Sequence, residues 1–192
     1  MTETARPAAP LSGALFDELL VVMIQQGERA ALDRLHSRWD KRLVRAAYRY
    51  TGDAELARDL AQECWIGIWK GIPGLRDPSR FRSFAFAILH RRGADHLRLA
   101  IRRKDYESHS DAAPEKAEVS RQEEALAIGE AFASLPPEQR LAAHLHFVEG
   151  LTLAEIAVVQ SIPTGTAKSR LFHARRKLKA ALNPDFAQGE LQ

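Results

Sequence analysis

A run of basic side chains near the C-terminal end has the composition of a surface that binds nucleic acid. Between Thr164 and Leu182 the chain has six Lys or Arg residues and no Asp or Glu. Cationic side chains contact phosphates, and the polar groups beside them contact base edges. The alternative is an ordinary solvated helix face, but such faces usually mix charges of both signs. The run therefore predicts a contact with DNA.

The residues around this run predict the two helices of a helix-turn-helix. Thr152 and Glu155 have the spacing of a capping box, which predicts a helix start at Thr152. Pro163 suits the first turn of a helix and predicts a second helix from about Thr164. The apolar residues of this second helix recur at helical spacing, so the other face is free to enter a major groove. The residues expected to contact DNA are Thr166, Lys168, Ser169, Arg170, Phe172, His173, Arg175 and Arg176.

This half of the chain resembles domain four of the sigma-70 family, most closely that of the small extracytoplasmic-function (ECF) group. The resemblance rests on two stretches in the family's order and spacing, residues 135–157 and 162–175. It implies that the second helix reads the upstream promoter element as duplex, with Arg170 and Arg175 on the phosphates. Gln160 and Ser161 stand where the family usually has leucine and glycine. We therefore expect looser packing of the turn or a displaced Val159.

A second resemblance lies upstream, in an acidic segment followed by tryptophans. Residues 59–63 have the sequence Asp-Leu-Ala-Gln-Glu, and Trp65, Ile66 and Trp69 follow them. Each tryptophan taken alone could be a core residue, but an acidic and amide helix face could meet a basic partner. The segment is similar to the part of sigma factors that docks on the clamp helices of RNA polymerase. The residues implied in docking are Asp59, Gln62, Glu63, Trp65 and Trp69.

A third segment, residues 81–104, combines basic and aromatic side chains. It has seven basic residues and one acidic residue, interleaved with Phe81, Phe84 and Phe86. Basic groups contact phosphates and aromatic rings stack on unpaired bases, although the apolar spacing places some of these rings in the core. The segment resembles the ECF region that melts and reads the downstream promoter element. The implied contacts are Phe81, Arg82, Arg91, Arg92, Asp95, His96 and Arg98.

This third segment departs from the family at two positions. Phe84 and Arg91 stand where family members commonly have tryptophan and asparagine. The preferred downstream sequence therefore stays open.

The length of 192 residues suits two small helical domains. No segment has sustained strand alternation, so the predicted fold is all-α, and a long amphipathic helix should run through Leu32 to Tyr50. Residues 105–124 carry seven acidic and two basic residues and read as a flexible acidic linker. This linker is either a simple tether or, as in the family, a segment in the polymerase's RNA-exit path. The predicted divisions are a disordered N-terminus (1–14), sigma domain 2 (15–104), the linker (105–122), sigma domain 4 (123–183) and a tail (184–192).

Other classes of protein fit the sequence poorly. There is no long apolar span and no signal-peptide pattern, which predicts a cytoplasmic protein. Cys64 is alone, and His144 and His146 are two residues apart, on different faces of a helix. We therefore expect no catalytic site, no metal site, no cofactor and no enzyme activity.

The sequence thus predicts an ECF-type sigma factor whose partners are core RNA polymerase, promoter DNA and an anti-sigma factor. A conventional helix-turn-helix regulator explains only the C-terminal half of the chain. A sigma mimic that binds an anti-sigma factor is expected to lose the basic groups that this chain retains. Neither the promoter sequence nor the identity of the anti-sigma factor follows from the residues.

Overall fold

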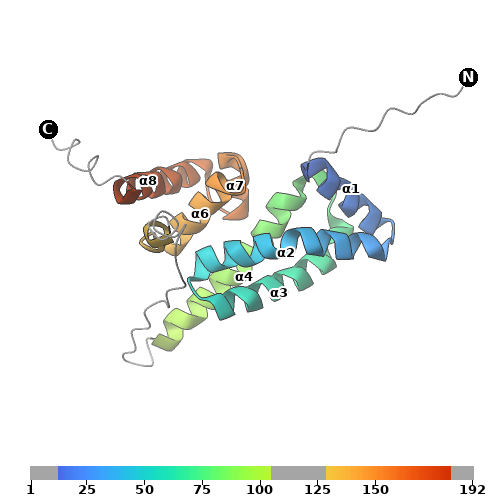
Figure 1. Ribbon diagram of the computed structural model, residues 1–192, viewed down its shortest axis with the longest axis horizontal. Helices are drawn as coiled ribbons and strands as arrows, with labels where there is room; N and C mark the ends of the chain where they lie inside the picture. Colours follow the sequence, from blue (N-terminus) through green and yellow to red (C-terminus); the bar gives the residue numbers. More distant parts are fainter. Residues whose placement is uncertain (1–12, 105–128, 183–192) are drawn as a thin grey trace, which may run out of the picture.

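The computed structural model describes residues 13–104 and 129–182, which are helical throughout apart from turns and loops (Figure 1). The predicted all-α fold is confirmed for these residues, none of which forms a strand. The predicted linker and tail lie outside them, whereas α1 begins at Gly13, two residues before the expected domain start. The first part contains α1 (Gly13–Gln25), α2 (Arg29–Thr51), α3 (Ala54–Gly71), the short 3-10 turns η1 (Ile72–Gly74) and η2 (Pro78–Arg80), and α4 (Phe81–Lys104). The second contains helical residues 129–133, α6 (Pro137–Phe147), α7 (Leu153–Val159) and α8 (Thr164–Leu182).

The long helix α2 is the centre of the first domain, and α3 and α4 pack along it. Its buried face includes Leu35, Trp39, Leu43 and Tyr50, as the amphipathic pattern predicts. The helix ends at Gly52, whose positive φ of 79° lets its N–H return to the carbonyl of Tyr48. Asp53 then caps α3 by accepting hydrogen bonds from two backbone N–H groups.

A glycine in the middle of α4 allows this helix to approach α2 closely. A Cβ atom at Gly93 would lie 2.5 Å from two ring carbons of Tyr50 and 3.2 Å from a methyl carbon of Leu60. Both neighbours are buried in the core. The absence of a side chain at this position therefore determines where the Tyr50 ring can lie.

The second domain contains the predicted helix-turn-helix. The capping box is present, since the Thr152 hydroxyl accepts from the Glu155 N–H and the Glu155 carboxylate accepts from the Thr152 N–H. Gln160 is buried, and its amide donates to the Glu138 carbonyl oxygen at 2.9 Å. Val159 is buried as well, so the expected loosening at this turn is wrong. Gln160 replaces an apolar contact with hydrogen bonds.

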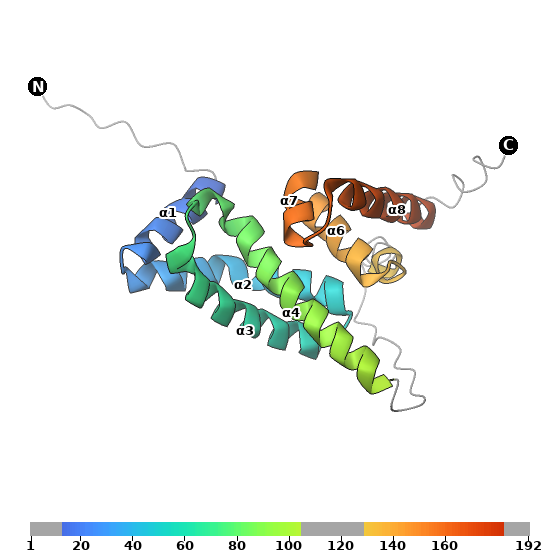
Figure 2. The ribbon, with the colours of Figure 1, turned by 180° about the vertical axis from the view of Figure 1, so that it is seen from behind.

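The two domains pack against each other, with α6 on α2 and α7 against α4 (Figure 2). One cluster of buried apolar side chains includes residues of both domains, among them Leu43 and Leu89 of the first and Leu141, Leu145 and Ile156 of the second. The other side of α6 contributes Ala143 to a small cluster with Ala174 and Leu178 of α8. α6 therefore joins the helix-turn-helix to the first domain. Within the described ranges, no helix is long and apolar enough to cross a membrane.

The turn before α8 gives a first prediction, because Ser161 has a φ of 52°. A non-glycine residue in this region is strained by about 1 kcal/mol relative to glycine. Replacing Ser161 with glycine should therefore raise the free energy of unfolding by about 0.5–1 kcal/mol, measured by urea denaturation. Ser161→Ala keeps the strain and is the matched control. Equal stability of the two variants would contradict this explanation.

Candidate nucleic-acid interface

The α8 helix presents most of its predicted DNA-contacting residues to solvent. Ala167 and Ala174 are buried against the rest of the domain, which turns the other face outward. Phe172 is 61% exposed, and its ring meets that of His173 edge-on with centroids 5.6 Å apart. The exposed members of the predicted set are Thr166, Lys168, Ser169, Phe172, His173, Arg175 and Arg176. Together they form a basic surface with hydrogen-bonding and aromatic groups.

Arg170 differs from its neighbours on α8 because its guanidinium is directed into the protein. Its Nη1 donates to Glu138 Oε2 and to Gln160 Oε1, both at 2.9 Å. The side chain is partly buried between these two acceptors. In this conformation Arg170 holds α8 on α6, and a phosphate contact by it would compete with Glu138.

The second predicted DNA face, on α4, is divided between exposed and engaged residues. Arg91, Arg92, Asp95 and Arg98 are exposed, and Asp95 pairs with Arg98 at 2.8 Å. Arg82 and His96 are partly buried and have protein partners. The C-terminal half of the described face is thus the more accessible half.

The position of Phe81 contradicts the prediction that its ring contacts a base. It is only 1% exposed, and its ring packs edge-on against Trp39 with centroids 5.0 Å apart. A ring buried in this way has no free face on which a base could stack. Phe81 is therefore a core residue, whereas Phe84 is only partly buried.

The predicted docking helix, α3, presents acidic, amide and apolar groups side by side. Asp59 and Gln62 are exposed, and Trp69 is 66% exposed at the end of the helix. Ile66, not included in the predicted set, is also exposed and adds apolar surface. An exposed tryptophan beside acidic groups is typical of an interface with another protein.

Two other predicted docking residues are held by neighbouring helices. Glu63 Oε1 lies 3.1 Å from Nε2 of His96 in α4. The indole N–H of Trp65 donates to Asp40 of α2, and its ring lies against His36. These contacts fix the two side chains on the surface of the first domain.

A partly buried carboxylate, Glu138, lies where the two domains meet. It accepts from the Tyr50 hydroxyl at 2.7 Å and contacts His90 Nε2 at 3.0 Å, in addition to Arg170. Burial alone would raise its pKa, but the contacts with His90, Tyr50 and Arg170 outweigh burial and lower the pKa to about 2. Glu138 is therefore ionised and links α2, α4, α6 and α8.

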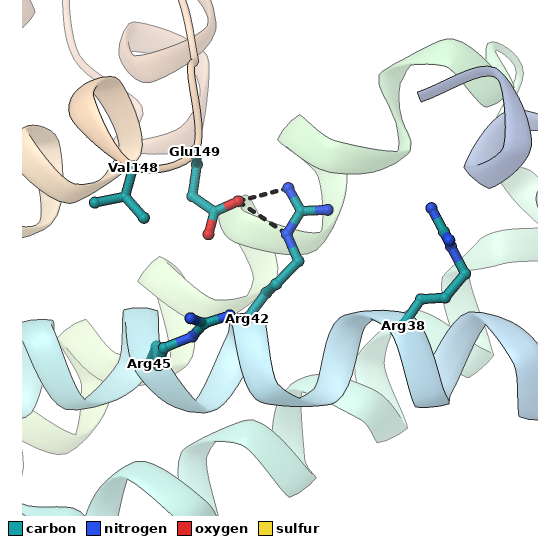
Figure 3. Close-up of a pocket in the computed structure, with 5 residues that line it drawn as sticks. All are labelled: Arg38, Arg42, Arg45, Val148 and Glu149. Atoms are coloured by element: carbon teal, nitrogen blue, oxygen red, sulfur yellow. Dashed lines mark hydrogen bonds and ion pairs between the residues drawn. The ribbon is translucent and has the colours of Figure 1, made fainter. Parts of the chain in front are cut away.

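A second carboxylate, Glu149, joins the α6–α7 loop to α2 (Figure 3). Its Oε2 accepts from Arg42 Nε at 3.0 Å and from Arg42 Nη2 at 2.5 Å. Burial would raise the pKa of Glu149, yet the nearby His144 and Arg42 lower it. Beside this pair is a hollow of about 520 Å³, lined also by Arg38, Arg45 and Val148.

A third contact connects α4 to the start of α7. Arg82 donates to the Glu149 carbonyl oxygen at 3.0 Å and lies 3.4 Å from Glu155 Oε1. The Ser83 hydroxyl approaches the same oxygen at 3.4 Å. One residue predicted to bind downstream DNA is thus engaged by the second domain.

Sequence reasoning missed these interdomain residues. Tyr50, Glu138 and Glu149 belong to no basic cluster, and Tyr50 and Glu138 are 88 positions apart. Glu149 lies within the stretch 135–157 that carries the family resemblance, but the resemblance indicates no contact with the first domain. Their significance depends on packing between distant segments.

The side chains considered for catalysis or metal binding, Cys64, His144 and His146, are buried or partly buried. Cys64 is buried, its thiol faces the Ala85 carbonyl oxygen at 3.5 Å, and burial raises its pKa to about 12. His144 is buried beside Glu149, whereas His146 contacts the Leu151 carbonyl oxygen. In the part of the chain that the structure covers, no three His, Cys, Asp or Glu residues are grouped to hold a metal ion.

The fold and its surfaces define a two-domain helical transcription factor with a C-terminal helix-turn-helix. The sequence profile of Sigma-70 region 2 matches residues 35–103, and that of Sigma-70 region 4 matches residues 125–178. The chain belongs to the sigma-70 family of RNA polymerase sigma factors, within the ECF group, as the resemblance predicted. It is a promoter-specific transcription initiation factor.

Two related sigma factors match most of the chain. The RNA polymerase sigma-H factor of Pseudomonas aeruginosa is 29% identical, with 88% of this chain and 94% of that protein covered. The ECF RNA polymerase sigma-E factor of Escherichia coli K12 is 26% identical, with coverages of 91% and 98%.

Two structures share the fold at lower sequence identity. CnrH in complex with the cytosolic domain of CnrY is 22% identical, with a TM-score of 0.60 and coverages of 88% and 99%. The sigma factor RpoE in complex with the anti-sigma factor NepR from Bartonella quintana is 21% identical, with a TM-score of 0.65 and coverages of 78% and 95%.

The low pKa of Glu138 gives a second prediction. Ionised Glu138 stabilises the folded protein above about pH 4.5, and this stabilisation is lost as the pH falls from there toward about 2. The wild type should therefore be more stable than Glu138→Gln at neutral pH, and the difference should shrink below about pH 4.5. Denaturant unfolding at several pH values measures it.

Glu130, exposed in the same domain, provides the control variant Glu130→Gln. This variant should be as stable as the wild type at neutral pH. A difference between wild type and Glu138→Gln that stays constant down to pH 3 would show that Glu138 carries no depressed pKa.

Proposed function

We propose that the chain binds core RNA polymerase through α3 and reads the two promoter elements with α4 and α8. The observation that carries this proposal is the exposed face of α8, a basic surface without acidic residues after a capped helix and a tight turn. Lys168, Ser169, Phe172, His173 and Arg176 are proposed to contact base edges. Arg175, and Arg170 once it leaves Glu138, are proposed to contact phosphates.

On α4, the proposed contacts with the melted downstream element are the exposed side chains. Arg91, Arg92 and Arg98 can follow the phosphates, and Asp95 can accept from a base. Arg82 and His96 would join them after release from their protein partners. Phe81 supports this face from the core rather than touching DNA.

On α3, the proposed docking surface consists of Asp59, Gln62, Glu63, Trp65 and Trp69, with Ile66 added. The exposed carboxylate of Asp59 and the exposed ring of Trp69 suit a partner that combines basic and apolar groups. Glu63 and Trp65 are already fixed by contacts within the domain.

The proposed function also includes control by a second protein. A solved structure of similar fold is described as a sigma factor in complex with an anti-sigma factor. We infer that this chain is also held by an anti-sigma factor, in the cytoplasm, and that it has no enzyme activity of its own. Sigma factors are non-catalytic initiation factors.

The overall test is co-purification of the chain with sigma-free core RNA polymerase, followed by run-off transcription on a pooled promoter library. Binding with new start sites is expected, and the start sites identify the promoter. Failure to bind core together with specific retention of duplex DNA would instead support a conventional helix-turn-helix regulator.

A third prediction concerns Lys168 on α8. Lys168→Ala should weaken binding to a duplex recovered from that library and lower the slope of log K against log salt by about 1. Lys41→Ala, an exposed lysine on α2, is the matched control and should change neither quantity. Fluorescence anisotropy across a salt series gives both values. An unchanged slope for Lys168→Ala would remove this residue from the DNA contacts.

A fourth prediction concerns Asp59 on α3. Asp59→Lys should reduce co-purification with core polymerase while leaving the fold and duplex binding intact, because the side chain is exposed and its charge is reversed. Asp33→Lys makes the same change on the exposed face of α2 and should bind core normally. If both variants co-purify like the wild type, the docking assignment is wrong.

A further inference from the structure

The interface between the domains has donors on one side and acceptors on the other. Tyr50, His90, Arg42 and Arg82 of the first domain direct donor groups at the second domain. Their acceptors are the carboxylates of Glu138, Glu149 and Glu155 and the carbonyl of Glu149. The second domain therefore presents three carboxylates to α2 and α4, with the cation Arg140 beside the end of α2.

The charged groups of this interface also have partners within their own domains. Arg42 lies 3.9 Å from Asp17 of α1 as well as contacting Glu149. Glu138 has Arg170, at 2.9 Å. A partly buried charge that loses its partner destabilises the molecule. A second partner removes most of that cost.

The other two carboxylates follow the same arrangement. Glu149 lies 3.6 Å from His144, which precedes it in the same domain. Glu155 accepts from both the N–H and the hydroxyl of Thr152 at 2.8 Å, the contacts of the capping box. If the domains separate, Glu138 and Glu155 retain hydrogen bonds within the second domain, and Glu149 keeps His144 beside it. Opening therefore costs these charged groups little, although it exposes apolar side chains that the two domains share.

The closed arrangement covers part of the α4 face. Arg82 is engaged by Glu155 and the Glu149 carbonyl, and His90 is engaged by Glu138. The turn at Val159–Ser161 faces α4 across a hollow of about 430 Å³ that Phe84, Arg91 and Arg98 also line. A nucleic-acid strand along the part of α4 from Arg82 to His90 would meet the carboxylates of the second domain.

The geometry points to a reversible latch: in the free chain, Glu138, Glu149 and Glu155 occupy donors of α2 and α4 and keep part of the downstream-reading face closed. The carboxylates of Glu138 and Glu155 occupy His90 and Arg82, groups that a single strand could otherwise contact. Opening then exposes Arg82 and His90 and releases the turn from α4. The covering of a DNA face rests on the function proposed above, whereas the latch rests on the interdomain contacts alone.

The latch is tested first without DNA or polymerase. Dyes on cysteines introduced by Ser37→Cys on α2 and Lys177→Cys on α8, both exposed positions, report the interdomain distance by single-molecule energy transfer. Cys64 is buried and stays unlabelled. Glu138→Gln and Glu149→Gln should each shift molecules toward low transfer, and Glu130→Gln should not. Unchanged transfer in both interface variants, with folding verified by circular dichroism, would overturn the latch.

Removing Asp17, the alternative partner of Arg42, should shift the energy transfer in the opposite direction. Asp17→Asn removes the alternative partner of Arg42, so in the open form this arginine would be left without a carboxylate. Added to Glu138→Gln, it should return molecules toward high transfer. A further shift toward low transfer would show that Asp17 does not act as the alternative partner.

The covering of α4 is tested with a 20-nucleotide single-stranded DNA of random sequence. The opened variants Glu138→Gln and Glu149→Gln should bind it about fivefold more tightly than the wild type, because a larger fraction is competent to bind. If the variants open but bind the single strand no more tightly, the second domain does not cover a DNA face of α4, although the latch itself stands. Arg91→Ala with Arg92→Ala in the opened variant should weaken binding, and if it does not, the proposed DNA face itself is wrong.

Discussion

The ionised carboxylate of Glu138 is the contact on which the arrangement of the whole molecule depends. It lies in the first turn of α6 and accepts from α2, α4 and α8, while its backbone carbonyl accepts from Gln160 in the turn. A single charge thus fixes the first domain, the helix-turn-helix and the start of α8 relative to one another. A neutral group of the same shape would lose the charge-assisted hydrogen bonds that hold this arrangement together.

Around this contact, α6 uses two faces for two purposes. Leu141 and Leu145 belong to the large apolar cluster that includes residues of the first domain, and Ala143 belongs to the small cluster with α8. Because the small cluster is limited in size, the second domain gains much of its apolar burial from its neighbour. The polar contacts between the domains then select one orientation within that apolar interface.

The elements that local sequence determines could be predicted, and those that depend on distant packing could not. The Thr152–Glu155 pair acts within a few residues, so the start of α7 followed from the sequence. The predicted DNA contact of Phe81 was wrong because its ring is covered by Trp39, which is distant in sequence. Gln160 was expected to loosen the turn, yet its partners, Glu138 and Arg170, come from other helices. The exposed basic face of α8 followed from periodicity, but the inward direction of Arg170 did not.

The close approach at Gly93 extends the influence of one missing side chain into another domain. The ring of Tyr50 fills the space that a Cβ atom at this position would need, and the same ring carries the hydroxyl that reaches Glu138. A larger residue in the middle of α4 would move the tyrosine, and with it a donor that acts on α6. The residues that position 93 can accept are therefore limited by the ring carbons of Tyr50 rather than by helix propensity within α4.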